Sequence, residues 1–157
     1  MRVIVQRCKE ASVIVDDEII GKISKGYLIL VGFNIDDNEE IIKKIAKKII
    51  NLRIFEDDDK KMNLDLNEVN GSILSVSQFT LYAKLEGRRP SFSNAMPYAK
   101  ASKMYDLFNK TLKSYNVNVK TGKFGADMKV SLINDGPVTI IIDSEELAWK
   151  RTLITNI

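Results

Sequence analysis

Two hydroxyl groups and one amide lie close together in an otherwise apolar part of this sequence. Ser77, Gln78 and Thr80 belong to the segment 72–82, whose composition is typical of a β-strand. Strand alternation would place Ser77 and Phe79 on one face and the other two side chains on the opposite face. Because buried polar side chains need hydrogen-bond partners, this cluster is either satisfied by its neighbours or faces a ligand.

The composition limits the chemistry that such a cluster could perform. The chain has no histidine, which excludes a Ser-His or Cys-His catalytic pair and histidine-containing zinc sites. Its one cysteine, Cys8, lies in a strand-like run, which favours a buried apolar role over a nucleophilic one. The acidic run 56–61 is interpreted as a solvated loop, and no metal or cofactor is expected. Hydrolysis would have to use carboxylates, hydroxyls, backbone groups or chemistry brought by the substrate.

A second polar stretch, residues 134–139, reads Asn-Asp-Gly-Pro-Val-Thr and separates two apolar runs. Asn, Asp, Gly and Pro each favour a turn, so the pattern predicts a hairpin turn between strands at 130–133 and 138–142. A Gly136-Pro137 bond can also be cis at modest cost, which would aim both carbonyls the same way.

Strands and helices alternate along the rest of the chain. Branched apolar residues predict strands at 2–7, 11–15, 19–23, 26–33 and 116–120. The run 26–33 is apolar enough for burial on both faces of a sheet. This order predicts an α/β fold with a mixed, largely antiparallel sheet, in a single domain over residues 1–157. No apolar run is long enough to span a membrane, and there is no signal-peptide pattern, so a cytoplasmic protein is expected.

Two main helices are expected on apolar spacing. The first follows a polar linker in which Asp37 and Glu40 have the spacing of a capping box. The second begins at Pro97 and carries an apolar stripe of Ala101, Tyr105, Phe108 and Leu112. A shorter helix is expected to start at Ser144 and to include Trp149.

Basic residues gather in two places, although the net charge is only +3. The polar face of the first helix carries Lys43, Lys44, Lys47 and Lys48. This face is either a solvated surface over a core stripe or a surface for an anionic partner, RNA or membrane. The loop around Arg88 and Arg89 is suited to phosphate contacts.

Taken together, the two polar stretches resemble the paired signature of the D-aminoacyl-tRNA deacylases. The resemblance covers nearly the whole chain and includes Met1-Arg2-Val3-Ile4-Val5-Gln6-Arg7, Lys61-Met62-Asn63-Leu64, Ser77-Gln78-Phe79-Thr80-Leu81, Arg89-Pro90-Ser91-Phe92, Gly122-Lys123-Phe124-Gly125-Ala126-Asp127-Met128 and Asn134-Asp135-Gly136-Pro137-Val138-Thr139. The chain departs from the family pattern at Cys8, where a small branched residue is usual, and in the loop 83–89, which is slightly shorter.

The resemblance implies a fold, an activity and an assembly. Members hydrolyse the ester that joins a D-amino acid, or glycine mischarged on tRNA-Ala, to the terminal adenosine of a tRNA. They are cytoplasmic homodimers with a three-layer α/β/β architecture, in which two main helices lie on one side of packed β-sheets. The 2′-hydroxyl of the terminal ribose is thought to assist cleavage.

The resemblance also implies roles for individual residues. Gly136-Pro137 corresponds to a cis pair that enters the partner subunit's site and excludes L side chains through its backbone. The wall that holds the adenosine and the ester corresponds to Ser77, Gln78, Phe79 and Thr80, the last with a positioning role. Support for the Gly-Pro loop falls to Arg7 and Asn134. Contacts to the adenosine or the tRNA fall to Phe124, Met128, Arg88 and Arg89.

Two other functions remain compatible with the residues. One is a non-catalytic, dimeric RNA-binding module that uses the lysines of the first helix together with Arg88 and Arg89. The other is a structural dimerisation domain whose hydroxyls satisfy one another.

Overall fold

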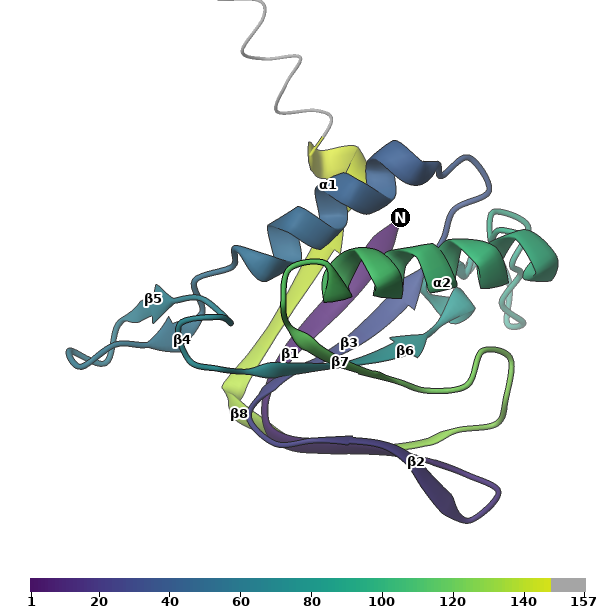
Figure 1. Ribbon diagram of the computed structural model, residues 1–157. Coiled ribbons are helices and arrows are strands. Elements are labelled where there is room, and N and C mark those ends of the chain that lie inside the picture. The colour runs from purple at the N-terminus through teal and green to yellow at the C-terminus, as the bar shows by residue number, and fades with distance from the viewer. Residues whose placement is uncertain (148–157) are drawn as a thin grey trace, which may run out of the picture.

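The computed structural model describes residues 1–147 and has three layers (Figure 1). Two helices, α1 (Glu39–Ile50) and α2 (Tyr98–Lys113), cover one face of a six-stranded sheet. On the other side, β2 (Glu18–Ile23) and the adjoining halves of two long strands form a second β layer. The predicted α/β/β architecture is therefore confirmed. Within residues 1–147, no helix has the length and apolar character needed to cross a bilayer.

The strand order is β2-β1-β3-β6-β7, with β8 paired to β1. The bounds are β1 Arg2–Val15, β3 Gly26–Gly32, β6 Ser72–Ser77, β7 Asn118–Thr121 and β8 Lys129–Asp143, and a separate small ribbon holds β4 Phe55–Glu56 and β5 Met62–Leu64. The strands predicted at 2–7 and 11–15 are one strand, because β1 pairs with β3 through its first half and with β2 through its second. The β3–β6 and β6–β7 pairs are parallel, so the sheet is mixed as predicted.

Side-chain alternation along β3 divides the core into two clusters. Tyr27, Ile29 and Val31 pack towards the helices, whereas Leu28 and Leu30 pack towards the second β layer. This arrangement confirms the burial of this strand on both faces. Cys8 belongs to the second cluster and is 1% exposed, as its apolar surroundings predicted.

The start of α1 differs from the prediction. The N-cap is Asn38, whose side-chain oxygen accepts a hydrogen bond from the Ile41 N–H at 3.0 Å. Asp37 is instead buried and pairs with the amino group of Met1 at 2.6 Å. A buried carboxylate gains more from a charged partner than from a helix N–H, so the capping box does not form.

The later helices follow the prediction as far as the structure describes them. Pro97 precedes the first turn of α2, and all four residues of its predicted apolar stripe are buried. A helical turn begins at Ser144, and Trp149 lies outside the described residues.

Candidate active site

The polar segment Ser77 to Thr80 marks the point where β6 ends. Ser77 pairs with Val31 at the end of β3, and the Gln78 N–H donates to the Val31 carbonyl at 2.7 Å. The chain then turns into a short 3-10 helix, Phe79–Tyr82. The predicted single strand over 72–82 is therefore wrong, and so is the alternation of faces expected within it. β3 ends one residue after Val31, so β6 has no neighbouring strand with which to continue pairing beyond this point.

A cavity of about 500 Å³ opens beside this turn. Its wall brings together five of the residues expected at the site, namely Ser77, Gln78, Phe79, Phe124 and Met128. The other lining residues are Val76, Met96, Tyr98, Ala101, Gly125, Ala126 and Val130. The size is within the range of small-molecule sites, and the lining is mostly apolar with a few polar groups, as such sites usually are.

Aromatic rings form two pairs at the edge of this cavity. Phe79, which is 59% exposed, meets Phe92 edge to face at 4.8 Å between ring centroids. Phe124 meets Tyr98 edge to face at 5.0 Å. Gly125 has a φ of 77°, and a Cβ there would lie 2.6 Å from the Tyr98 ring. Only glycine therefore lets Tyr98 close over this loop.

The polar groups of the cavity are uncharged. Among the described lining residues there is no Asp, Glu, Lys or Arg. The Gln78 amide donates to the Thr80 hydroxyl, and Thr80 itself stays outside the lining. The backbone N–H groups of Phe79 and Thr80 donate to no other described residue. This geometry offers an amide and the Ser77 hydroxyl in the wall of a neutral cavity, with two free N–H donors in the adjoining turn.

The Asn134–Thr139 stretch is a bulge within β8 and does not form a hairpin turn. Residues 139–143 pair with β1 at 2–6, and residues 129–134 pair with the same strand at 8–14. Both flanking runs therefore face β1 and do not face each other, so the hairpin prediction is wrong. Residues 135–138 stand opposite Arg7 alone, and the Gly136-Pro137 bond within them is cis.

Two side chains hold this bulge. Arg7 is 5% exposed, and its Nε donates to the Asp135 carbonyl at 2.7 Å while its Nη1 donates to the Ile54 carbonyl at 2.6 Å. Asn134 accepts from the Val138 N–H at 2.7 Å and donates to the Thr139 hydroxyl at 3.1 Å. The bulge is thus fixed from both strands and from the segment after α1.

The bulge and the cavity lie far apart within one chain. Gly136-Pro137 is level with Tyr27, the partner of Arg7, whereas Ser77 is level with Val31 at the other end of β3. Three strand spacings of about 4.8 Å and four residues of about 3.3 Å separate them, or roughly 19 Å. At that separation, the bulge does not reach a small ligand beside Ser77 of the same chain.

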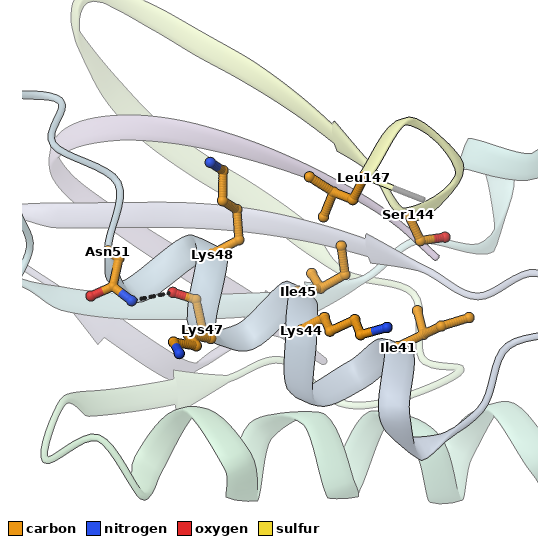
Figure 2. Close-up of a pocket in the computed structure, with 8 residues that line it drawn as sticks. All are labelled: Ile41, Lys44, Ile45, Lys47, Lys48, Asn51, Ser144 and Leu147. Carbon is orange, nitrogen blue, oxygen red and sulfur yellow. Dashed lines mark hydrogen bonds between the residues drawn. The ribbon is translucent and has the colours of Figure 1, made fainter. Parts of the chain in front are cut away.

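The two basic regions lie outside this cavity. Arg88 and Arg89 are exposed on a loop whose base is closed by paired backbone hydrogen bonds between Lys84 and Ser91. Lys44, Lys47 and Lys48 line a different cavity of about 440 Å³ on α1. Figure 2 shows the apolar wall of this α1 cavity, with Leu147 opposite Ile45. It contains none of the residues predicted for the site.

Sequence reasoning missed several lining residues, of which Tyr98 is the most informative. Tyr98 is 67% exposed at the start of α2, outside the buried stripe of that helix. An aromatic residue off the apolar face was the available signal. Met96 and Val130 carried no signal, because each stands in a loop or strand where an apolar residue is ordinary.

Comparisons with known proteins agree over nearly the whole chain. The family described as D-Tyr-tRNA(Tyr) deacylase matches residues 4–143. The D-aminoacyl-tRNA deacylase of Listeria innocua is 55% identical, and that of Thermosipho africanus is 53% identical. In each case the match covers 94% of this chain and 99% of the relative. A solved structure, "c-Myc DNA Unwinding Element Binding Protein", is 39% identical with a TM-score of 0.86, covering 91% of this chain and 98% of that one. The chain therefore belongs to the D-Tyr-tRNA(Tyr) deacylase family.

Proposed function

We propose that this protein hydrolyses the ester of D-aminoacyl-tRNA, and of glycyl-tRNA mischarged on tRNA-Ala, in a site shared by two subunits. The products are the free amino acid and the tRNA, and the reaction takes place in the cytoplasm. The observation that carries the proposal is the pairing of a neutral, aromatic-edged cavity at Ser77 to Thr80 with a rigid Gly136-Pro137 bulge. Membership in the deacylase family supports the same reaction.

The cavity suits the esterified terminal adenosine. Nucleobases stack on aromatic side chains, and Phe79, Tyr98 and Phe124 present such rings at the wall. A nucleoside ester carries no phosphate, and its base and ribose are uncharged, so a lining without charged side chains fits them. We assign Phe124 and Met128 to the adenosine, and Gln78, held by Thr80, to the ester end.

The chemistry needs little from the side chains. Water attacks the ester carbonyl carbon, the carbonyl oxygen becomes an oxyanion, and the bond to the ribose oxygen then breaks. The free N–H groups of Phe79 and Thr80 are donors for this oxyanion. The attacking water gives up a proton, and the departing 3′-oxygen of the ribose takes up a proton. The neighbouring 2′-hydroxyl assists this departure. With no charged lining residue to act as a base, Thr80 keeps a positioning role.

Two features of a single subunit support a homodimer: an exposed edge strand and the separation of the bulge from the cavity. β8 pairs only with β1 among the described strands, and it exposes Val130, Ile133 and Ile141. A long edge strand with exposed apolar side chains is a typical surface for association. The roughly 19 Å between bulge and cavity means that Gly136-Pro137 has to come from the partner. Selection by backbone then rejects L side chains of every kind, because it responds only to the Cα configuration.

Deacylation of D-Tyr-tRNA and L-Tyr-tRNA tests the function directly. We expect release of D-tyrosine and sparing of L-tyrosine by the parent protein. Gly136→Ala should lower the D over L ratio or the D rate, because φ is 146° and a Cβ would lie 2.7 Å from Val138 Cγ2 and 3.1 Å from Arg7 Nη2. Gly87→Ala is the matched control, since no atom lies within 4 Å of its Cβ. Equal hydrolysis of both enantiomers, or of neither, would refute the function.

A mixing experiment tests the shared site. Gly136→Ala and Gln78→Ala chains should each be impaired alone, because each homodimer has two damaged sites. After unfolding and refolding together, mixed dimers carry one intact site, so about a quarter of the parent activity should return. No recovery in a mixture with verified exchange would show that both residues act within one subunit or in separate sites.

A further inference from the structure

We propose that a basic cavity next to the adenosine cavity binds the phosphates of the single-stranded RNA just before the terminal adenosine. This proposal rests on the function proposed above and extends the substrate contact beyond the last nucleoside. The cavity has a volume of about 410 Å³ and lies between the second half of α2 and the end of β7.

Phe124 joins the two cavities. It lines both, and its ring lies 5.0 Å from Tyr98 on the adenosine side and 5.7 Å from Tyr105 on the other side, measured between centroids. A strand that leaves the adenosine cavity over Phe124 therefore enters the second cavity at once. Along α2, the rise from Ala101 in the first cavity to Lys113 in the second is about 18 Å at about 1.5 Å per residue.

The charges of the two cavities differ in the way that such a strand requires. The second cavity is lined by Lys110, Lys113 and Lys123, all exposed, against one carboxylate, Asp106. The first has no charged side chain among its described lining residues. A neutral wall suits the nucleoside, and clustered ammonium groups suit the phosphodiesters that follow it.

A buried amide gives independent support for a ligand here. Asn109 lines the second cavity, is 5% exposed, and its Oδ1 has no hydrogen-bond partner among the described residues. Buried polar atoms without a partner are uncommon, and a turn of the Asn109 side chain towards the cavity would let this oxygen accept from a ribose hydroxyl or a base N–H. Single-stranded RNA supplies both types of donor together with phosphates.

Substrates of increasing length test the assignment. Three esters are compared: D-tyrosyl-adenosine, a trinucleotide that ends in D-tyrosyl-adenosine, and D-Tyr-tRNA. In the variant Lys110→Gln, Lys113→Gln and Lys123→Gln, kcat/KM for the two longer substrates should fall about tenfold at ~0.1 M salt. The slope of log kcat/KM against log salt should flatten by about 2 for D-Tyr-tRNA and by about 1.4 for the trinucleotide, which has fewer phosphates. For the nucleoside ester, kcat/KM should stay within about twofold, because that substrate carries no phosphate.

A matched control separates this surface from total charge. Lys43→Gln, Lys47→Gln and Lys48→Gln remove the same charge from α1 and should leave the length dependence unchanged. An equal effect of both triple variants, or an unchanged kcat/KM on every substrate, would overturn the assignment while leaving the deacylase function intact. Loss on the nucleoside ester as well would also overturn it, because that loss points to the adenosine cavity itself. Failure of the parent protein to hydrolyse any of the three esters would instead refute the proposed function.

Discussion

Replacement of Arg7 tests whether the position of the Gly136-Pro137 bulge controls selection. The guanidinium donates to two main-chain carbonyls, of Asp135 within the bulge and of Ile54 after α1, at 2.7 and 2.6 Å. Arg7→Lys keeps the charge but has no planar fork, so it can maintain at most one of these two contacts well. Net hydrogen bonds to a charged group are worth about 1.5–3 kcal/mol each.

The expected loss follows from that number. Losing one contact should lower the free energy of unfolding by about 1.5–3 kcal/mol. If the same energy positions the bulge for the reaction, kcat/KM for D-Tyr-tRNA should fall about 10- to 150-fold. Because a misplaced bulge also stops excluding L side chains, the ratio of D to L rates should fall.

The assay combines urea unfolding with deacylation of both enantiomers. Arg53→Lys is the control, because Arg53 also donates to a main-chain carbonyl, that of Asn63 at 2.7 Å, but on the exposed surface. That variant should change stability by no more than about 0.5 kcal/mol and leave both rates unaltered. If Arg7→Lys loses stability but keeps the parent kcat/KM and D over L ratio, the link between bulge position and selection is refuted.

Two further predictions concern stability. Asp37→Asn removes the carboxylate that pairs with the Met1 amino group, and the uncompensated buried charge should cost about 3–5 kcal/mol in urea unfolding; a loss below about 1 kcal/mol would contradict this prediction. Burial raises the pKa of the Cys8 thiol from 9.0 to about 11, and burial also raises the pKa of Tyr27 and Tyr82. The unfolded chain therefore releases these protons first, so the stability that these three groups contribute should be constant below about pH 9 and fall as pH rises towards 11. Cys8→Val should remove the thiol's share, about 2–3 kcal/mol, from this alkaline loss, and identical alkaline profiles for parent and variant would contradict the assignment.

The elements that could be predicted from sequence are those whose burial repeats along the chain itself. Alternating or continuous apolar residues define β1 and β3, and the stripe of α2 is buried from Ala101 to Leu112. In each case the period of the side chains and the face they bury are local properties.

The features that could not be predicted depend on a distant partner. Turn chemistry at Asn134 to Thr139 is compatible with a hairpin, but β1 is long enough to pair with both flanking runs, and the same residues then form a bulge. Asp37 has the spacing of a cap residue, yet the charged amine that it binds lies 36 positions away. The strand through Ser77 stops where β3 stops, which no property of residues 78–82 reveals.

Dependence on a distant partner also explains why the motifs Ser77 to Thr80 and Asn134 to Thr139 are more informative together than either is alone. The amide, hydroxyls and N–H groups at Gln78 to Thr80 can bind an ester of either configuration, because none of them contacts the bulge of its own chain. The bulge, held by Arg7, is rigid and presents backbone, but it borders no described cavity that contains the other motif. Under the proposed function, one subunit alone would hydrolyse the ester without selecting its configuration, or would present the selecting backbone without a site for the ester. An edge strand such as β8, with Ile133 and Ile141 exposed, provides the contact through which a second copy could supply the missing half. Under the proposed function, association is therefore a requirement of stereochemical selection as well as a means of burying apolar surface.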